Sequence, residues 1–598
     1  MIKRTMMLLM GFAVLWTPLA AQMDAPSRIK RVESGLLPPV LVKGEPTWTI
    51  QQRMIEYKVP GVSIAVIDSF RIAWVKAYGV KDAGTQEPVT PQTLFQAASI
   101  SKSVNATAVM LEVQRGRLSL DVNVNQYLTS WKLRDTAATA TTNVTLANLL
   151  SHTGGTTVSG FPGYEPTEAL PTVQQILNGM PPANTAPIVV DIEPAKRFRY
   201  SGGGTTITQL ALMELEGKPY PQILKELILN PVGMSSSTFE QPLPASRVFE
   251  AAAAHGPDGT PAPGKYHVYP ELAAAGLWTT PTDLAKFAIE HQLSLKGKSN
   301  GILSQESEEK TMTPYIGEGY GLGFGIEKKG NAEFFQHSGG NYGFSCLLIA
   351  HKRKGYGAVV MLNSNTFALI PEIIRSIAKE YSWEEFLPAP YEVAQVSPEK
   401  LQKVTGRYLS DRDEVVRIRE EEGKLFAEAT LTPRIELLPI SETEFIRRDV
   451  GSRAVLLKGA DPQHDTLKIF GGAGVLMAPR LSDDHLTPFE MLQAGNVAEA
   501  VGQYKSIKQS SPSDPSIAEP RMNLIGYQLL RNGKIDAAIA VFAMNVEFYP
   551  KSWNVYDSLG EAMAKKGDKR SAIKNYREAL RLNPGAGSAR KALLELKE

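Results

Sequence analysis

The sequence has very little cysteine, and its apolar runs are short after the first residues. Only one of 598 residues, Cys346, is a cysteine, which excludes a disulfide framework and a thiolate metal site. HExxH and CxxC patterns are also absent, so we expect no metal and no cofactor. The formal net charge is only +2, which gives no basic field for nucleic acid. No later apolar stretch is long enough to cross a bilayer, so we expect no membrane span.

The first residues have the pattern of a secretory signal peptide. A lysine and an arginine precede an apolar run from Met6 to Trp16, and small residues follow up to Ala21. This order is typical of a signal peptide, and the run is shorter than the roughly 20 residues of a spanning helix. We therefore expect residues 1–21 to be removed near Ala21, which places the mature chain in the periplasm or outside the cell.

Residues 40–386 mix strand-like alternation with helical periodicity. The stretch "GVSIAVIDSFRIAWVKAYGV" (61–80) predicts two β-strands with a turn near Asp68. The stretch "SVNATAVMLEVQRG" (103–116) predicts a helix that ends at Gly116. Strands before a helix in one region predict an α+β domain.

Residues 391–482 have a different texture. Short strands such as "VVRIREEEGKLFAEA" alternate with turns that contain Gly, Asp and Pro. This pattern predicts a small antiparallel β domain, either a barrel or a sandwich.

The last part of the chain, residues 484–598, repeats at a period of 34. The stretch "GYQLLRNGKIDAAIAVFAMNVEFYP" (526–550) overlays "GEAMAKKGDKRSAIKNYREALRLNP" (560–584), with Phe542 on Tyr576. The period and the small residues at predicted helix crossings resemble the tetratricopeptide family, an all-α array of stacked helix pairs. The resemblance implies a docking surface for a protein partner; the alternative is an array that only packs on its neighbours.

A serine and a lysine stand where a predicted helix begins. In "FQAASISKSVNATAV", Ser99 and Lys102 would share one helix face near free backbone N–H groups. A serine becomes nucleophilic when a neighbour accepts its proton, and a desolvated lysine can do this. The chain contains seven Ser-x-x-Lys pairs, so spacing alone does not single out this one. The alternative is that Ser99 caps the helix and Lys102 is solvated.

Further motifs follow this pair in a fixed order. They are "VTLANLLSHTGG" (144–155), "RFRYSGGG" (197–204), "YPELAAAGLWTTPTDLAKF" (269–287), "YGLGFGIE" (320–327) and "QHSGGNYGFS" (336–345). Together they resemble the class C β-lactamase and penicillin-binding serine hydrolase family over about residues 45–385. The resemblance implies an α+β fold, with an antiparallel sheet flanked by helices and a helical subdomain.

The resemblance also implies catalytic roles. Ser99 matches the nucleophile, and Lys102 matches its partner lysine. Tyr200 matches a tyrosine that transfers protons to and from the leaving group. The alternative for Tyr200 is a core tyrosine whose hydroxyl is satisfied elsewhere.

A third element lies in "QHSGG". His337, with Ser338 and Gly339, matches Lys-Thr-Gly of classical β-lactamases and His-x-Gly of many esterase-like and peptidase-like relatives. By the same resemblance, Ser338 and Gly339 contribute to substrate binding. The backbone N–H groups of Ser99 and Gly340 would form an oxyanion hole, which stabilises developing negative charge.

Two positions depart from the family pattern. Gly202 stands where the family has an asparagine, so the amide that helps to hold the lysine and the substrate is missing. His337 replaces a lysine, and we expect its imidazole to titrate near neutrality and to hold a carboxylate less firmly. His152 follows the predicted helix "TLANLL", where we expect it to cap or pack. Cys346 in "FSCLLIA" is expected to be a small buried side chain.

The sequence therefore predicts a periplasmic serine hydrolase of the β-lactamase family that forms an acyl-enzyme on Ser99. Its small-molecule or peptide substrate would be a β-lactam, a D-amino-acid peptide or a small ester. The domain at 391–482 resembles the lipocalin-like barrel often appended to this family, and we assign it no chemistry. The alternative function is a non-catalytic, ligand-sensing or peptidoglycan-associated binding protein whose repeats recruit a protein partner.

Overall fold

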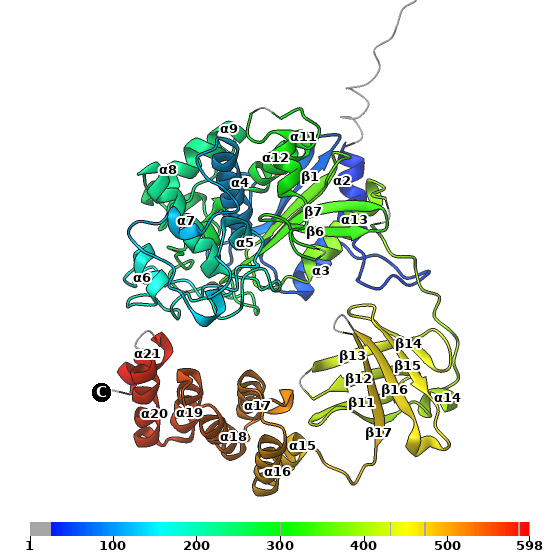
Figure 1. The fold of residues 1–598 in the computed structure, drawn as a ribbon. Helices are drawn as coiled ribbons and strands as arrows, with labels where there is room; N and C mark the ends of the chain where they lie inside the picture. Colours follow the sequence, from blue (N-terminus) through cyan, green and yellow to red (C-terminus); the bar gives the residue numbers. More distant parts are fainter. Residues whose placement is uncertain are drawn as a thin grey trace, which may run out of the picture.

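The computed structural model describes most of the chain as three consecutive units. The described residues are 25–299, 301–317, 319–384, 386–430, 432–471, 474–583 and 586–596. The predicted signal peptide, residues 1–21, lies outside them. Figure 1 shows a large α+β unit, then a β-barrel, then a helical C-terminal segment. Among the described residues, we find no helix with both the length and the apolarity that a bilayer crossing requires.

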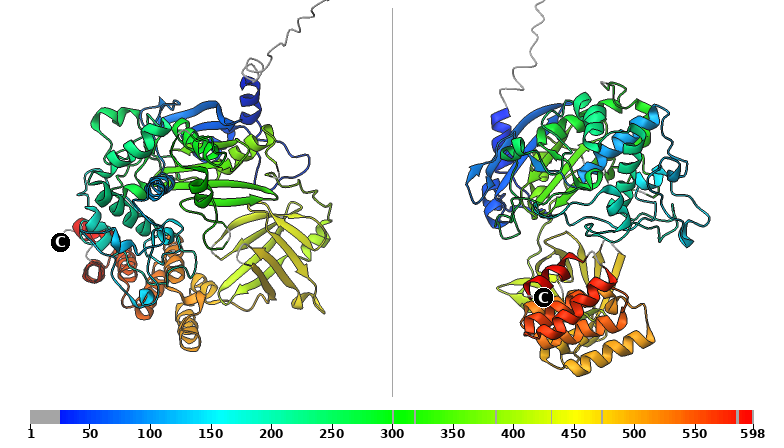
Figure 2. Two further views of the ribbon diagram at one scale, coloured as in Figure 1. Left: turned by 45° about the horizontal axis from the view of Figure 1, so that its top comes forward. Right: turned by 90° about the vertical axis from the view of Figure 1, so that its left-hand side faces the viewer.

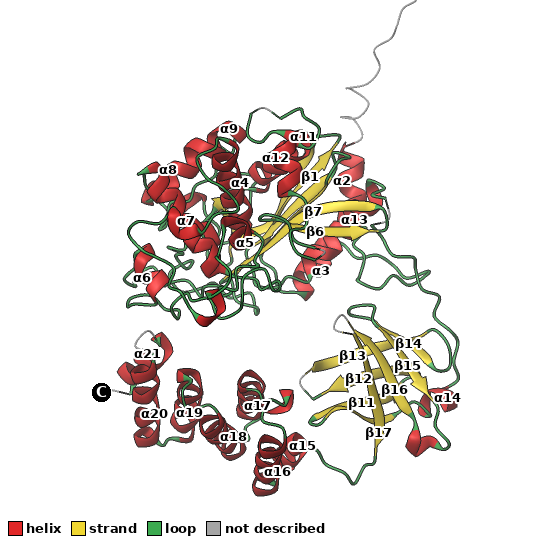
Figure 3. Cartoon of the chain, in the orientation of Figure 1, coloured by secondary structure: helices red, strands yellow, loops and turns green. Residues whose placement is uncertain are grey.

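A seven-stranded antiparallel sheet forms the centre of the α+β unit (Figure 3). Its order is β3-β2-β1-β9-β8-β7-β6, so strands from both ends of the unit meet where β1 pairs with β9. The predicted strand pair at 61–80 is confirmed, because β1 and β2 form a hairpin in which Asp68 pairs with Arg71. The strands are β1 (Gly61–Asp68), β2 (Arg71–Asp82), β3 (Glu87–Pro88), β6 (Gly325–Lys329), β7 (Ala332–Asn341), β8 (Phe344–His351) and β9 (Gly357–Leu362).

Helices cover both faces of this sheet (Figure 2). On β1, Val62 and Ile64 belong to a core shared with helices on one face. Ala65 and Ile67 belong to a second core on the other face, as expected for a strand that is buried on both sides. The helices of the first core are α2 (Ala25–Glu33), α3 (Ile50–Glu56) and α13 (Leu369–Glu380). The second core includes α4 (Ile100–Gln114) and α11 (Pro281–Ser294).

Helix α4 is the central helix of the α+β unit, and its residues 100–112 are all buried. The predicted helix and its end are confirmed, because Gly116 follows the C-cap with a φ of 72° that suits glycine. The other elements of the unit are β4 (Phe95–Gln96), β5 (Trp278–Thr279), α5 (Leu146–Leu150), α6 (Val173–Asn178), α7 (Gly202–Glu216), α8 (Tyr220–Leu224), α9 (Asn230–Val232), α10 (Leu272–Ala275) and α12 (Gln305–Thr311).

The second unit is a closed eight-stranded barrel, so of the two predicted β architectures the barrel is observed. The barrel closes where β10 pairs with β17, and inward side chains such as Tyr408 and Phe445 fill it. Its strands are β10 (Gly406–Asp411), β11 (Glu414–Glu421), β12 (Lys424–Ala429), β13 (Thr432–Pro439), β14 (Glu444–Arg447), β15 (Arg453–Leu457), β16 (Thr466–Gly471) and β17 (Gly474–Leu481), preceded by α14 (Pro398–Gln402).

The third unit is helical. Gly526 and Gly560, which are 34 residues apart, each lie against an aromatic ring of the next helix. A Cβ atom would stand 2.4 Å from Phe542 at the first glycine and 2.9 Å from Tyr576 at the second, so the repeated glycines make room for the repeated rings. The helices are α15 (Pro488–Ala494), α16 (Val497–Ser510), α17 (Glu519–Arg531), α18 (Ile535–Phe548), α19 (Trp553–Lys566), α20 (Lys569–Leu582) and α21 (Gly587–Glu595).

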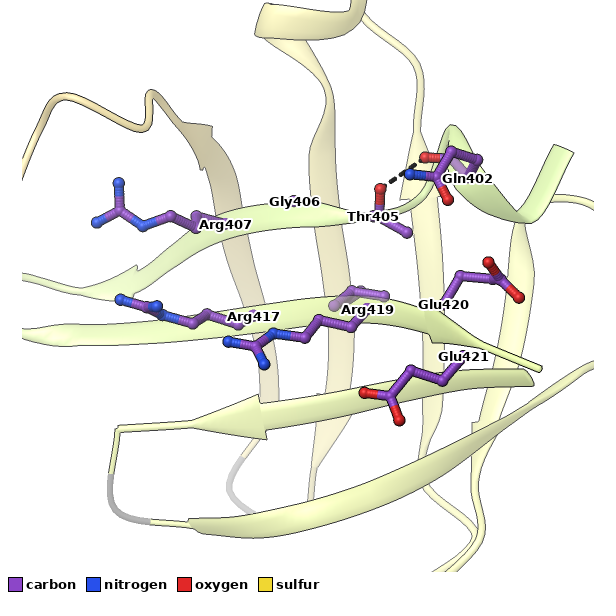
Figure 4. Close-up of a pocket in the computed structure, with 9 residues that line it drawn as sticks. Gln402, Thr405, Gly406, Arg407, Arg417, Arg419, Glu420 and Glu421 are labelled. Atoms are coloured by element: carbon purple, nitrogen blue, oxygen red, sulfur yellow. Dashed lines mark hydrogen bonds between the residues drawn. The ribbon is translucent and has the colours of Figure 1, made fainter. Parts of the chain in front are cut away.

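A charged joint connects the barrel to the first of these helices. Arg407 and Arg417 face each other across β10 and β11, and in Figure 4 their side chains extend to the same side. Both donate to the carboxylate of Glu490 on α15, which is nearly buried. These two arginines line a hollow of about 370 Å³, which lies on the barrel and outside the α+β unit. Figure 4 draws the residues that line it. Arg407 and Arg417 therefore hold α15 on the barrel.

Candidate active site

Ser99 lies at the start of α4, directly after a strained turn. Ala98 has a φ of 48°, a conformation that is rare for a residue with a Cβ. The Ser101 hydroxyl stabilises the turn, because it donates to the Ala98 carbonyl (2.6 Å) and accepts from Leu277 N–H (3.0 Å). The Ser99 side chain makes no capping hydrogen bond within the described residues, and its backbone is already helical. The alternative that Ser99 is only a helix cap is therefore wrong.

Lys102 lies one helical turn further along α4, and its side chain is buried. Its Nζ donates to Ser99 Oγ at 3.0 Å and to the Ala274 carbonyl of α10 at 2.7 Å. Only 4% of the residue is exposed, so the alternative of a solvated lysine is also wrong. This contact puts a candidate proton acceptor for Ser99 at hydrogen-bond distance.

Tyr200 comes to the same place from a distant part of the chain. It directly precedes Ser201, which caps α7 by accepting from Gly204 N–H at 2.9 Å. The Tyr200 ring centroid lies 5.0 Å from Lys102 Nζ, and the residue is half-buried. Within the described residues its hydroxyl makes no direct hydrogen bond to Ser99. The structure thus brings Tyr200 to Lys102, in a half-buried position rather than in the core.

His337 on β7 is the third element. Its Nδ1 lies 2.6 Å from the Ser338 carbonyl, which can only accept, so Nδ1 carries the proton. Its Nε2 then accepts from the Tyr320 hydroxyl at 3.1 Å. The ring centroid is 6.2 Å from that of Tyr200. His337 therefore joins Ser99, Lys102 and Tyr200 in one site.

The expectation that His337 titrates near neutrality is wrong. Burial, and then the neighbouring Lys102 ammonium, lower the pKa of His337 from 6.5 to about 3. The imidazole is therefore uncharged at neutral pH. A substrate carboxylate would find no cation at this position.

The edge of β7 lies against the loop that carries Ser99. Strand β6 pairs with β7 only as far as Gln336, so the residues of β7 after Gln336 do not pair with β6. Gly339 faces inward, where a Cβ atom would stand 2.2 Å from the Ala97 carbonyl oxygen and 2.5 Å from Cys346 Sγ. Ser338 and Gly340 are exposed, and a Cβ on Gly340 would meet open space. Glycine at 339 thus allows the close approach of β7 to Ala97, two residues before Ser99.

Cys346 is a structural residue, as predicted. Its side chain is fully buried, and its thiol donates to the Ala97 carbonyl at 3.1 Å. Burial raises the pKa of the Cys346 thiol, so it does not act as a nucleophile.

Gly202, the departure from the family asparagine, is explained by a neighbouring ring. A Cβ atom at this position would lie 2.9 Å from Phe161 Cε2 and 3.2 Å from the Ser159 carbonyl oxygen. The Phe161 ring therefore occupies part of the space that an asparagine side chain would need.

The sequence does not predict that Tyr320 and His152 contact the side chains of the candidate active site. Tyr320 stands in the motif "YGLGFGIE", but nothing in that motif shows that its hydroxyl bonds His337. His152 was expected to cap or pack, and packing is confirmed: its ring centroid lies 4.3 Å from Tyr200 and 4.9 Å from Tyr320. Phe198 closes this aromatic cluster at 5.5 Å from Tyr320, and 48% of its surface is exposed.

Comparisons with known proteins identify the family of this chain. The family model for β-lactamases matches residues 48–378, and the chain belongs to this family. The order of motifs in the sequence had indicated the same family. Protein flp of Staphylococcus aureus strain MW2 is 25% identical over 334 residues, which are 53% of this chain and 62% of that protein. Penicillin-binding protein 4 of Amycolatopsis lactamdurans is 27% identical over 327 residues, 52% of this chain and 82% of that protein.

Two solved structures are also similar to this chain. The octameric penicillin-binding protein homologue from Pyrococcus abyssi has a TM-score of 0.49 at 24% identity, covering 72% of this chain and 98% of that one. The D-alanine carboxypeptidase AmpC from Burkholderia cenocepacia has a TM-score of 0.46 at 20% identity, covering 59% and 99%. The chain spans less than two thirds of the length of the Staphylococcus aureus proteins that it matches.

Proposed function

We propose that this chain is a serine hydrolase that cleaves esters or amides through an acyl-enzyme on Ser99. The observation that carries the proposal is the 3.0 Å contact between Ser99 Oγ and the buried Lys102 Nζ. Lys102 Nζ accepts the Ser99 proton while Oγ bonds to the substrate carbonyl carbon. The N–H groups of Ser99 and Gly340 stabilise the oxyanion.

The intermediate then collapses and breaks the bond to the leaving group, which takes a proton through Tyr200. In the second half-reaction, water attacks the acyl carbon, the acid leaves, and Ser99 regains its proton. The position of Tyr200, with its ring at 5.0 Å from Lys102 Nζ, supports this proton path.

The surroundings favour an uncharged acyl donor over one with a carboxylate next to the scissile bond. His337 is uncharged, and Phe161 stands where the family has room for an amide. The exposed ring of Phe198 adds apolar surface near the site. Among the predicted substrates, a small ester therefore fits better than a β-lactam or a peptide with a free C-terminal carboxylate.

Kinetics with matched substrates and variants test this function. We expect hydrolysis of p-nitrophenyl butyrate to exceed hydrolysis of nitrocefin and of a D-alanyl-D-alanine peptide. Ser99→Ala should lower kcat by at least about 10³-fold. Ser307→Ala is the matched control, because Ser307 also precedes a lysine by three residues but lies on α12. Equal activity of Ser99→Ala and wild type would refute the proposal.

The roles of the other two units belong to the same proposal. We take the barrel as lipocalin-like and α15–α21 as tetratricopeptide repeats that recruit a protein partner, in a periplasmic or secreted chain. The Gly526 and Gly560 contacts at a period of 34 support the repeat assignment. The alternative of a non-catalytic binding protein is less favoured, because it gives no role to the buried contact between Lys102 and Ser99.

A further inference from the structure

His152 contacts the chain on both sides of Tyr200. Its carbonyl accepts from the N–H of Arg199, the residue before Tyr200, at 2.7 Å. Its imidazole Nδ1 accepts from Ser201 N–H at 3.2 Å, which is the peptide after Tyr200. One residue thus holds the two backbone groups that flank the tyrosine.

The backbone and the ring of His152 are suited to this contact. Its φ is 58°, in the left-handed region, and only 3% of the residue is exposed. The ring also packs on Tyr200 at a centroid distance of 4.3 Å. The backbone carbonyl, the ring nitrogen and the ring face therefore all meet the Arg199–Ser201 segment.

The imidazole stays uncharged, which keeps Nδ1 an acceptor. Burial, followed by Lys102 and His337, lowers the pKa of His152 well below its usual value. Since Nδ1 accepts, the proton is on Nε2, and Nε2 is buried with no hydrogen-bond partner among the described residues. The bond from Ser201 N–H to Nδ1 is thus the one hydrogen bond that the His152 ring makes among the described residues.

We propose that His152 is a positioning residue that fixes the Tyr200 side chain for proton transfer by holding the backbone N–H groups of Arg199 and Ser201 on either side of it. The inference rests on the proposed function of Tyr200. It assigns His152 a role in the rate of the chemical step, beyond the packing role expected from the sequence.

Three substitutions at His152 separate its left-handed backbone from the hydrogen-bond acceptor of its side chain. Asparagine adopts left-handed backbone readily and has a side-chain acceptor, whereas glycine adopts that backbone without an acceptor. Alanine lacks both properties. His351→Ala is the matched control, since His351 is buried and its Nδ1 also accepts backbone N–H groups, from Arg353 and Lys354, at the β8–β9 turn.

The variants are compared by kcat, KM and melting temperature with p-nitrophenyl butyrate. We expect His152→Ala and His152→Gly to lower kcat about 10- to 100-fold with little change in KM, because small misplacements of reacting groups are costly. His152→Asn should stay within about 3-fold of wild type, and His351→Ala should keep the wild-type kcat. If His152→Ala does not fold, the comparison of asparagine with glycine decides. Equal kcat for His152→Gly and His152→Asn would overturn the inference.

A double substitution tests whether His152 acts through Tyr200. We expect Tyr200→Phe to lower kcat about 10²- to 10⁴-fold, and His152→Gly to cost less than about 3-fold more in that background. If His152→Gly lowers kcat as much in the Tyr200→Phe background as it does in the wild type, the inference is overturned. The role of Tyr200 would still stand. Unchanged activity of Tyr200→Phe alone would instead refute the proposed proton path, and the inference with it.

Discussion

The replacement of Gly339 by alanine tests the arrangement that joins β7 to Ser99. The new Cβ would stand 2.2 Å from the Ala97 carbonyl oxygen, about 1 Å closer than van der Waals contact allows. Both obstacles are fixed, since one is backbone and the other is the buried thiol of Cys346. The strand must therefore move away from the Ser99 loop by about 1 Å.

This displacement would move β7, which carries Gly340, away from the Ser99 loop and so disturb the proposed oxyanion hole. We expect kcat/KM for p-nitrophenyl butyrate to fall about 10²-fold, because the oxyanion donors no longer converge. We also expect a loss of about 1–3 kcal/mol in unfolding free energy from overpacking. Gly340→Ala is the control for stability, since its Cβ meets open space and its N–H is kept. Wild-type kinetics and wild-type stability for Gly339→Ala would refute the reasoning.

Three further predictions concern His337, Glu490 and the contact between Phe161 and Gly202. His337 has a pKa of about 3 when folded and 6.5 when exposed, so between these values only the unfolded chain binds the proton. Stability should fall on acidification below about pH 6.5, by up to about 1.4 kcal/mol per pH unit for this residue, and urea unfolding of His337→Gln should show a smaller fall. Glu490→Gln removes the carboxylate that binds Arg407, so it should cost about 3 kcal/mol at the barrel joint and speed proteolysis there without changing ester hydrolysis. The double variant Phe161→Ala, Gly202→Asn should raise nitrocefin turnover relative to p-nitrophenyl butyrate, whereas Gly202→Asn alone should be destabilised by the Phe161 ring.

The order of the site motifs predicts the family from the sequence. The periodicity of the apolar residues predicts many of the strands and helices. Strand alternation at 61–80 and the stop at Gly116 depend on local chemistry, so they could be predicted. The period of 34 in the third unit depends on glycine and aromatic residues that meet in neighbouring helices, which also leaves a pattern in the sequence.

Other properties of the site depend on contacts between distant segments. The uncharged state of His337 comes from burial and from Lys102, which is more than 200 positions away in the chain. The position of Phe161 against Gly202 and the bond from Tyr320 to His337 also join separate segments. A single sequence gives the residue types but not these distances, so the charge of the site could not be predicted.

Mass spectrometry of the acylated enzyme tests the central claim most directly. The protein is mixed with p-nitrophenyl butyrate, quenched in acid during turnover and digested. We predict a butyryl group on the peptide that contains Ser99, and no such group in Ser99→Ala. Turnover by the wild type with the acyl group on another residue, or with equal labelling of Ser99→Ala, would contradict the account.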